Sequence, residues 1–185
     1  MVLLVMLGVS HFAQAQWDTL ALPFRSITIE DGLSQGMVNT IIQDRYGFMW
    51  FGTKDGLNRY DGYHFEVFRN DPEDSTTLTD NNVHLLFEDR NGRLWVGTDR
   101  GLDLFDRKTD SFHHVLHDLA PGDGSPHQIV QDRNGSLWFS RNDGLLRVDF
   151  GATANETVQA PKVTAVTRVL NRSCWVTMDR SGTIW

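Results

Sequence analysis

Asp44-Arg-Tyr-Gly-Phe-Met-Trp50 is the first of four stretches with one pattern, in which a tryptophan follows an aspartate by six residues and a glycine by three. The later copies are Asp89-Arg-Asn-Gly-Arg-Leu-Trp95, Asp132-Arg-Asn-Gly-Ser-Leu-Trp138 and Asp179-Arg-Ser-Gly-Thr-Ile-Trp185. Successive tryptophans are 45, 43 and 47 residues apart. A period of this length is typical of a repeat architecture. Since the fourth copy ends on the last residue, we expect the sequence to be a piece of a longer protein.

Each copy predicts the same order of strands and turns. A β-favouring run leads to each aspartate, as at 38–43 and 83–88. The following Asp-Arg-Asn-Gly type of sequence predicts a turn, because aspartate accepts backbone N–H groups and glycine adopts positive φ. Two more apolar runs follow, one around the tryptophan and one that ends at a second aspartate, seventeen residues after the first. A fourth run is present at 65–68 and, less clearly, at 112–116.

These patterns predict an all-β fold, namely an incomplete β-propeller. Four short antiparallel strands per unit, apolar on both faces, form a blade that is stacked between its neighbours. The predicted blades cover about 38–68, 83–116, 127–160 and 163–185, so three have four strands and the fourth has only started. Residues 24–29 resemble a lone fourth strand, which would complete the last blade and close the ring.

The tryptophans and aspartates of the repeat are interpreted as structural residues. A large flat indole ring fills the wedge between two twisted sheets, which predicts a packing role for Trp50, Trp95, Trp138 and Trp185. Stacking on a ligand is the alternative. Each aspartate lies in an equivalent turn, which favours turn formation over acid–base catalysis for Asp44, Asp89, Asp132 and Asp179.

The composition excludes several kinds of function. The net charge of −7 argues against nucleic-acid binding, which needs clustered Lys and Arg. The single cysteine, Cys174, permits neither an internal disulfide nor a thiolate metal cluster. His113, His114 and His117 lie close together but lack the spacing of a metal site. We therefore expect no catalytic group, metal or cofactor in this segment.

Residues 1–15 predict a secretory signal peptide. The stretch 1–9 is apolar apart from Gly8, and it is too short to span a bilayer. Ala13-Gln-Ala15 supplies the small residues of a cleavage site before Gln16. A buried strand or helix is the alternative reading of this stretch. We expect the mature segment, 16–185, to be exported and to hold no membrane anchor of its own.

The topology of a propeller points to one candidate binding surface. The inner strand of a blade starts at the same rim to which the loop between its second and third strands returns, and ligands bind where such loops converge. Polar residues occupy the starts of the inner strands at Asn39, His84 and His127, with Cys174 in the same column. The loops of that rim contribute polar and cationic side chains, and the ligand-binding candidates among them are Lys54, Arg100, Arg141 and Asn142.

Several motifs resemble the two-component regulator propeller repeat. They are Asp31-Gly-Leu-Ser34, Thr77-Leu-Thr-Asp-Asn81 and Asp89-Arg-Asn-Gly-Arg-Leu-Trp-Val-Gly-Thr98. The resemblance weakens in the third unit, where Ser140-Arg141 replaces Gly-Thr. It implies a periplasmic sensor region of a bacterial hybrid histidine kinase that detects oligosaccharides. It also implies self-association of the full-length sensor and an inner-membrane anchor, provided by segments downstream of this chain.

Two other functions stay open at this level. A secreted propeller enzyme, such as a lyase or hydrolase acting on sugars or lactones, would use His84 or His127 as its base. A scaffold for protein interactions would use the same rim without a small ligand. The rim is equally compatible with a solvated surface that binds nothing.

Overall fold

Three four-stranded antiparallel sheets build the molecule, as the propeller prediction requires. The computed structural model describes residues 24–117, 126–151, 161–172, 174–179 and 181–185, and the predicted signal peptide lies outside these ranges. Within them, no helix is long and apolar enough to cross a membrane. The first sheet contains β1 (Val38–Gln43), β2 (Met49–Thr53), β3 (Gly56–Tyr60) and β4 (Phe65–Phe68).

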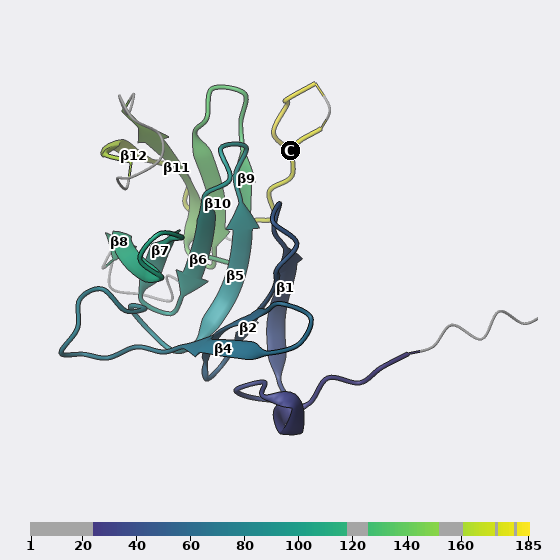
Figure 1. Ribbon diagram of the computed structural model, residues 1–185. Coiled ribbons are helices and arrows are strands. Elements are labelled where there is room, and N and C mark those ends of the chain that lie inside the picture. Colours follow the sequence, from purple (N-terminus) through teal and green to yellow (C-terminus); the bar gives the residue numbers. More distant parts are fainter. Residues whose placement is uncertain (1–23, 118–125, 152–160, 173, 180) are drawn as a thin grey trace, which may run out of the picture.

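The second and third sheets repeat this arrangement. The second contains β5 (Val83–Glu88), β6 (Leu94–Thr98), β7 (Gly101–Asp106) and β8 (Ser111–His117), and the third contains β9 (Gln128–Gln131), β10 (Leu137–Arg141), β11 (Gly144–Phe150) and β12 (Val163–Leu170). Each sheet follows chain order. The inner strands β1, β5 and β9 lie side by side, so the sheets stack as successive blades (Figure 1).

Two predicted boundaries differ from the structure. Strand β12 pairs with β11, so residues 163–170 are the outer strand of the third blade and not the start of the fourth. Residues 24–28 form no strand, and Ile29–Asp31 is a 3-10 helix capped by Thr28. A strand is stabilised by hydrogen bonds to a neighbour, and no described strand pairs with 24–29. The role of residues 24–29 in closing the last blade of a complete ring stays a prediction.

The fourth unit is present as a single tight hairpin. Residues 174–177 are extended without being assigned to a sheet, and Met178 forms an antiparallel bridge with Ile184. Thr177 and Trp185 exchange two backbone hydrogen bonds, of 3.1 and 2.9 Å. The aspartate turn of the repeat is therefore present here, although the described residues include no third or fourth strand of this blade.

The spacing of six residues between aspartate and tryptophan has a direct structural cause. Oδ1 of Asp44 accepts the backbone N–H groups of Tyr46 and Phe48, both at 3.0 Å, and closes the turn. Oδ2 of the same carboxylate accepts Nε1 of Trp50 at 2.8 Å. The indole bond recurs in the other three copies, at 3.0, 2.9 and 3.2 Å. One carboxylate therefore shapes the turn and orients the ring.

The oriented tryptophans fill the space between blades. Trp50 is fully buried, and its ring lies 5.0 Å from that of Phe105 in the second blade. Trp95 is also fully buried, 5.4 Å from the ring of Phe150 in the third. Trp138 is half-buried and Trp185 is 72% exposed, since no complete described sheet follows either of them. Burial of each ring thus depends on the next blade.

Glycine in the second strand lets neighbouring blades approach closely. A Cβ added to Gly52 would lie 2.6 Å from Cγ1 of Val83 on the next blade. A Cβ added to Gly97 would lie 2.7 Å from Cγ of Pro126, which precedes the third blade. Both distances are too short for real atoms, so a larger residue would force the blades apart. The third blade has Ser140 here, with the side chain fully buried.

The arginine after each of the first two repeat aspartates links one blade to the next. Arg45 donates to the carbonyl oxygens of Asp89 and Arg90, at 3.0 and 3.2 Å. Arg90 in turn donates to the carbonyl oxygens of Asp132 and Gln131, at 3.1 and 3.3 Å. The repeated turns therefore form a continuous row of hydrogen bonds across the blades.

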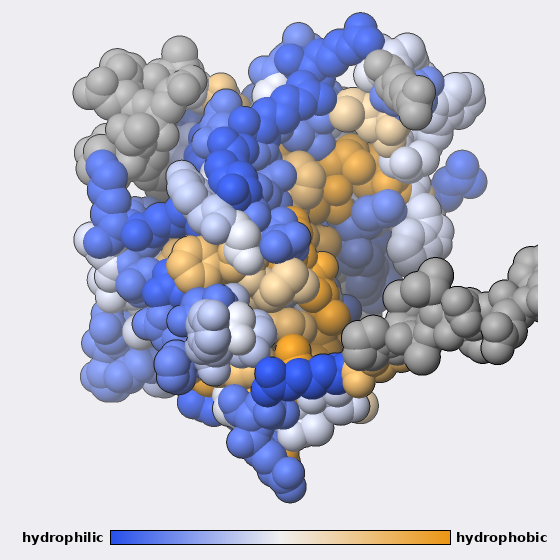
Figure 2. Space-filling view, turned by 45° about the vertical axis from the view of Figure 1, so that its right-hand side comes forward, coloured by the Kyte–Doolittle hydropathy of each residue, from blue (hydrophilic) through white to orange (hydrophobic). Residues whose placement is uncertain are grey.

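Not all apolar surface is covered. Figure 2 shows hydrophobic residues gathered in a band between hydrophilic regions. Met37 and Ile41, before and within the inner strand β1, are 58% and 56% exposed. Exposed apolar area on the inner strands is compatible with further blades around a common axis.

Candidate functional site

The starts of the inner strands and the loops between second and third strands share one rim, as the topology predicted. Val38 pairs with Thr53 and Val83 pairs with Thr98, which places the first residues of β1 and β5 beside the following turns. In the third blade, the N–H of His127 donates to the carbonyl oxygen of Ser140 at 2.9 Å. We use "rim" for residues 39, 84 and 127 together with turns 54–55, 99–100 and 141–143.

A hydrogen-bonded network joins the first two blades at this rim. Nε2 of His84 lies 2.5 Å from Oδ1 of Asp99. The other oxygen of Asp99 accepts the amide of Asn82 at 2.9 Å. Asn39 donates to the side chain of Asn82 at 3.3 Å and to the carbonyl oxygen of Val83 at 3.0 Å. The side chain of Asp99 is 46% exposed, so the network faces solvent.

The third blade has an equivalent pair, in which an asparagine takes the place of the aspartate. Nε2 of His127 lies 2.7 Å from the side-chain oxygen of Asn142, and both residues are exposed. Because an amide oxygen only accepts hydrogen bonds, Nε2 of His127 carries the proton. The rim therefore presents a histidine–carboxylate pair and a histidine–amide pair on adjacent blades.

Four residues of the predicted surface lie outside these two pairs. Arg141 is only 3% exposed, and its guanidinium pairs with Asp143 across 2.9 Å, so it offers little surface to a ligand. Lys54 lies on the rim turn of the first blade and is exposed. Asn39 bonds to the second blade instead of to Lys54. Cys174 is half-buried in the extended segment that precedes the fourth hairpin.

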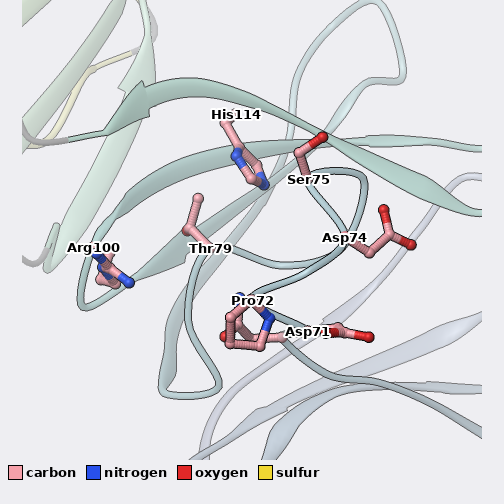
Figure 3. A pocket seen from close by; sticks show the side chains of 8 residues that line it. Asp71, Pro72, Asp74, Ser75, Thr79, Arg100 and His114 are labelled. Atoms are coloured by element: carbon pink, nitrogen blue, oxygen red, sulfur yellow. The ribbon is translucent and has the colours of Figure 1, made fainter.

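Arg100 lines a pocket that the predicted arrangement of the rim did not include. The cavity has a volume of about 250 Å³ and is lined by Asn70, Asp71, Pro72, Asp74, Ser75, Thr79, Arg100 and His114. Figure 3 shows Arg100 on one side of the pocket and Asp74 on the other, with Thr79 between them. The pocket extends the rim outwards, to the loop that connects the first two blades.

Sequence reasoning missed two parts of this surface. Asn82, which connects Asn39 to Asp99, lies one residue before β5 and outside the aligned columns. His114 was considered only within a histidine cluster, and the described residues contain no group of three or more His, Cys, Asp or Glu that could hold a metal. Its place could not be found from the offset, because the bulge between Leu102 and Asp103 shifts the register of the outer strand.

Comparison with protein families identifies the repeats. A model of the family described as "Two component regulator propeller" matches residues 32–55 and 77–100. These two segments hold the first and second copies of the aspartate turn. Residues 54 and 100 of the rim lie at their ends.

One relative shares a short segment at high identity. "Histidine kinase P4" of Formosa agariphila is 54% identical over 56 residues, which are 30% of this chain and 4% of that protein. The chain thus corresponds to a small part of this relative.

Solved structures with the same fold are extracellular domains. That of the putative hybrid two component system BT3049 from B. thetaiotaomicron is 22% identical, with a TM-score of 0.52, over 87% of this chain and 28% of its own. That of the putative one component system BT4673 from the same organism is 21% identical, with a TM-score of 0.64, over 84% and 21%. At these identities the likeness establishes the propeller fold.

Proposed function

We infer that this chain, two of whose repeats match the model of the two-component regulator propeller family, is part of an extracytoplasmic sensor region that binds oligosaccharides at its rim. The parent protein would be a hybrid histidine kinase, anchored in the inner membrane, with the propeller in the periplasm. The propeller itself would bind ligand without catalysing a reaction.

The hydrogen-bonded rim is the observation that carries this proposal. His84, Asp99 and Asn82 hold one another in place at the boundary of two blades, while Asp99 keeps much of its surface exposed. A sugar presents several hydroxyl groups, each of which both donates and accepts a hydrogen bond. Preorganised polar groups bind such a ligand without a further ordering cost in the protein.

Signalling would follow from the position of the rim between blades. A ligand that contacts two blades, or the propellers of two associated protomers, binds one relative arrangement better than another. The difference in affinity shifts the population towards that arrangement. Self-association of the full-length sensor would carry the shift to the membrane segment.

One observation favours a second function. The pair of His84 and Asp99, at 2.5 Å, is the arrangement in which a carboxylate orients a histidine as general base. A secreted lyase or hydrolase acting on sugars would use such a pair. The match to the regulator repeats favours the sensor, and an assay for sugar products separates the two.

Calorimetric titration of the full-length protein with a panel of oligosaccharides tests the proposal. We expect at least one to bind, and we expect the double variant H84A/H127A to weaken its binding at least about tenfold. His64→Ala is the matched control, since His64 is an exposed histidine beside Asp61, outside the rim. Failure of the whole panel to bind, or equal binding by the double variant, contradicts the proposal. Sugar turnover by the wild type supports the enzyme instead.

A further inference from the structure

The pocket beside Arg100 is formed by three parts of the first two blades. The loop between β4 and β5 contributes residues 70–79, the turn between β6 and β7 contributes Arg100, and β8 contributes His114 (Figure 3). Pockets for drug-sized ligands have volumes of about 300–1,000 Å³. A cavity of about 250 Å³ fits a smaller group, such as one sugar unit.

Comparison of the three blades shows that Arg100 replaces an aspartate that is ion-paired elsewhere. The residue eleven positions after the repeat aspartate is Asp55 in the first blade and Asp143 in the third. Asp55 pairs with Arg69 at 2.9 Å, and Asp143 pairs with Arg168 at 2.8 Å. Both arginines come from the outer part of the same blade. In the first and third blades, this position is therefore neutralised within the sheet.

The second blade reverses the charge and removes the ion pair. Arg100 occupies the position of Asp55, and the register of the outer strand places His117 where Arg69 lies in the first blade. Nε2 of His114 lies 2.8 Å from the carbonyl oxygen of Thr77, so this nitrogen donates to the loop. Within the described part of the chain, the guanidinium of Arg100 has no hydrogen-bond or ion-pair partner. Its five N–H groups are left for a ligand.

The walls of the pocket are held by hydrogen bonds to the blade. Phe112 donates its backbone N–H to the carbonyl oxygen of Thr76 at 2.7 Å. Thr79 donates its N–H and its hydroxyl to Oδ2 of the fully buried Asp103, at 2.9 and 2.8 Å. Asp71 donates its N–H to the hydroxyl of Thr77 at 2.9 Å. Because the loop is already ordered, a ligand does not have to order it.

Two acidic residues, Asp71 and Asp74, line the pocket on the side away from Arg100 (Figure 3). Oδ1 of Asp71 accepts the N–H of Glu73, and Oδ1 of Asp74 accepts the N–H and hydroxyl of Thr76. A carboxylate has about four lone-pair sites, so both can also accept hydroxyl groups from a ligand. A simple anion such as phosphate has few donors to offer them. A ligand that fits both sides carries an anionic group and several hydroxyls.

We propose that this pocket binds one hexuronic acid unit of an oligosaccharide, with its carboxylate on Arg100 and its ring hydroxyls towards Asp71 and Asp74. The planar guanidinium matches a carboxylate through two parallel N–H···O bonds. This proposal rests on the proposed function and adds the charge of the ligand and the place of its acidic unit.

Titration of the full-length protein with trigalacturonate and with its carboxyl-reduced, neutral counterpart tests the proposal. We expect trigalacturonate to bind more tightly than the neutral trisaccharide, and Arg100→Gln to remove this preference with a loss of about tenfold or more. Arg100→Lys keeps the charge but loses the planar fork, so we expect an intermediate loss. Arg172→Gln, which changes an exposed arginine outside the pocket, should bind as the wild type does.

The outcomes separate this proposal from the proposed function. Equal binding of the two trisaccharides, or an undiminished preference in Arg100→Gln, overturns the uronate site while oligosaccharide sensing stands. Binding of trigalacturonate that is lost in Arg100→Gln but kept in H84A/H127A supports the pocket and contradicts the role proposed for His84 and His127. If neither trisaccharide binds, the uronate site is rejected, and the wider oligosaccharide panel decides the proposed function.

Discussion

Arg107 donates to the carboxylate of Asp44 across 2.6 Å, although the two residues belong to different blades. The same guanidinium reaches Glu88 at 3.2 Å and lies 4.7 Å from the centre of the Tyr46 ring. The side chain of Asp44 is fully buried and also holds Nε1 of Trp50. One carboxylate therefore forms the turn, orients the indole ring and contacts the next blade.

Removal of such a carboxylate should destabilise the propeller strongly. In Asp89→Ala, the N–H groups of Asn91 and Arg93 and the indole of Trp95 lose their acceptor. We expect a loss of about 3–5 kcal/mol in the free energy of unfolding, measured by urea denaturation, because buried donors are left unpaired. Asp61→Ala removes an exposed turn aspartate that bonds only Tyr63 and His64 and should cost about 1 kcal/mol. Equal losses would contradict the role of burial.

The buried carboxylate of Asp44 should make stability depend on pH. Burial alone would raise the pKa of Asp44, but hydrogen bonds from Trp50 and Arg107, the charge of Arg107 and the N–H of Tyr46 hold it below the usual range. A lowered pKa in the folded state stabilises the protein above the unfolded pKa of about 3.9. This contribution is lost as the pH falls through the folded value.

Comparison of wild type with Asp44→Asn measures that contribution. We expect the difference in unfolding free energy to be largest near pH 6 and to shrink as the pH falls below about 4. Urea denaturation at several pH values follows it. A difference that is constant, or that grows towards acid, would show that the ionised form of Asp44 is not the stabilising one.

Offsets from the repeat aspartate predicted most of the fold because the interactions that set them are local. Asp44 bonds to residues two, four and six positions ahead, so each copy carries its own turn and tryptophan orientation. The outer strand of the third blade does not follow these offsets. Strand β12 begins 31 residues after Asp132, whereas β4 begins 21 after Asp44, and local spacing does not reveal which sheet such a strand joins.

The candidate site was predicted less completely because its contacts cross between blades. The position of His84 at the rim followed from topology, but its pairing with Asp99 was not predicted. Burial of Arg141 against Asp143 and the link from Asn39 to Asn82 depend on neighbouring side chains that no offset specifies. The pocket depends on a connecting loop, which lies outside the repeated strands.

Packing between turns predicts that replacing each of two glycines with alanine destabilises the protein by a different amount. Gly92 has φ of +82°, and a Cβ there would lie 2.5 Å from Cζ of Arg45 on the previous blade. Gly47, at the same position of the first turn, has φ of +91° and no atom within 4 Å of such a Cβ. Both alanine variants incur the backbone cost of about 1–2 kcal/mol. Gly92→Ala should lose about 1 kcal/mol more, because Arg45 is displaced from its two carbonyl acceptors.

A double variant tests this explanation. In an Arg45→Ala background the side chain that obstructs Gly92 is gone, so Gly92→Ala and Gly47→Ala should then cost the same. Thermal unfolding of Gly92→Ala and Gly47→Ala, each alone and each combined with Arg45→Ala, gives the comparison. A persistent excess for Gly92→Ala would place its cause elsewhere in the turn.

Substitution of a buried aromatic residue should also destabilise the protein more than substitution of an exposed one. Trp50 is fully buried between the first two blades, so Trp50→Ala should lower the free energy of unfolding by about 3–5 kcal/mol. Tyr63, which is 85% exposed, serves as the control, and its alanine variant should change stability by less than about 0.5 kcal/mol. Urea denaturation followed by circular dichroism measures both, and a similar effect of the two substitutions would be inconsistent with packing between blades.

The central claim is that the rim receives the ligand that the sensor reports. Its most direct test is the phosphorylation of the full-length protein in membrane vesicles, measured with and without an oligosaccharide that binds the wild type. We predict that the oligosaccharide changes the rate of phosphorylation in the wild type and in His64→Ala, and that H84A/H127A keeps the basal rate but loses the response. An undiminished response in H84A/H127A would contradict the claim.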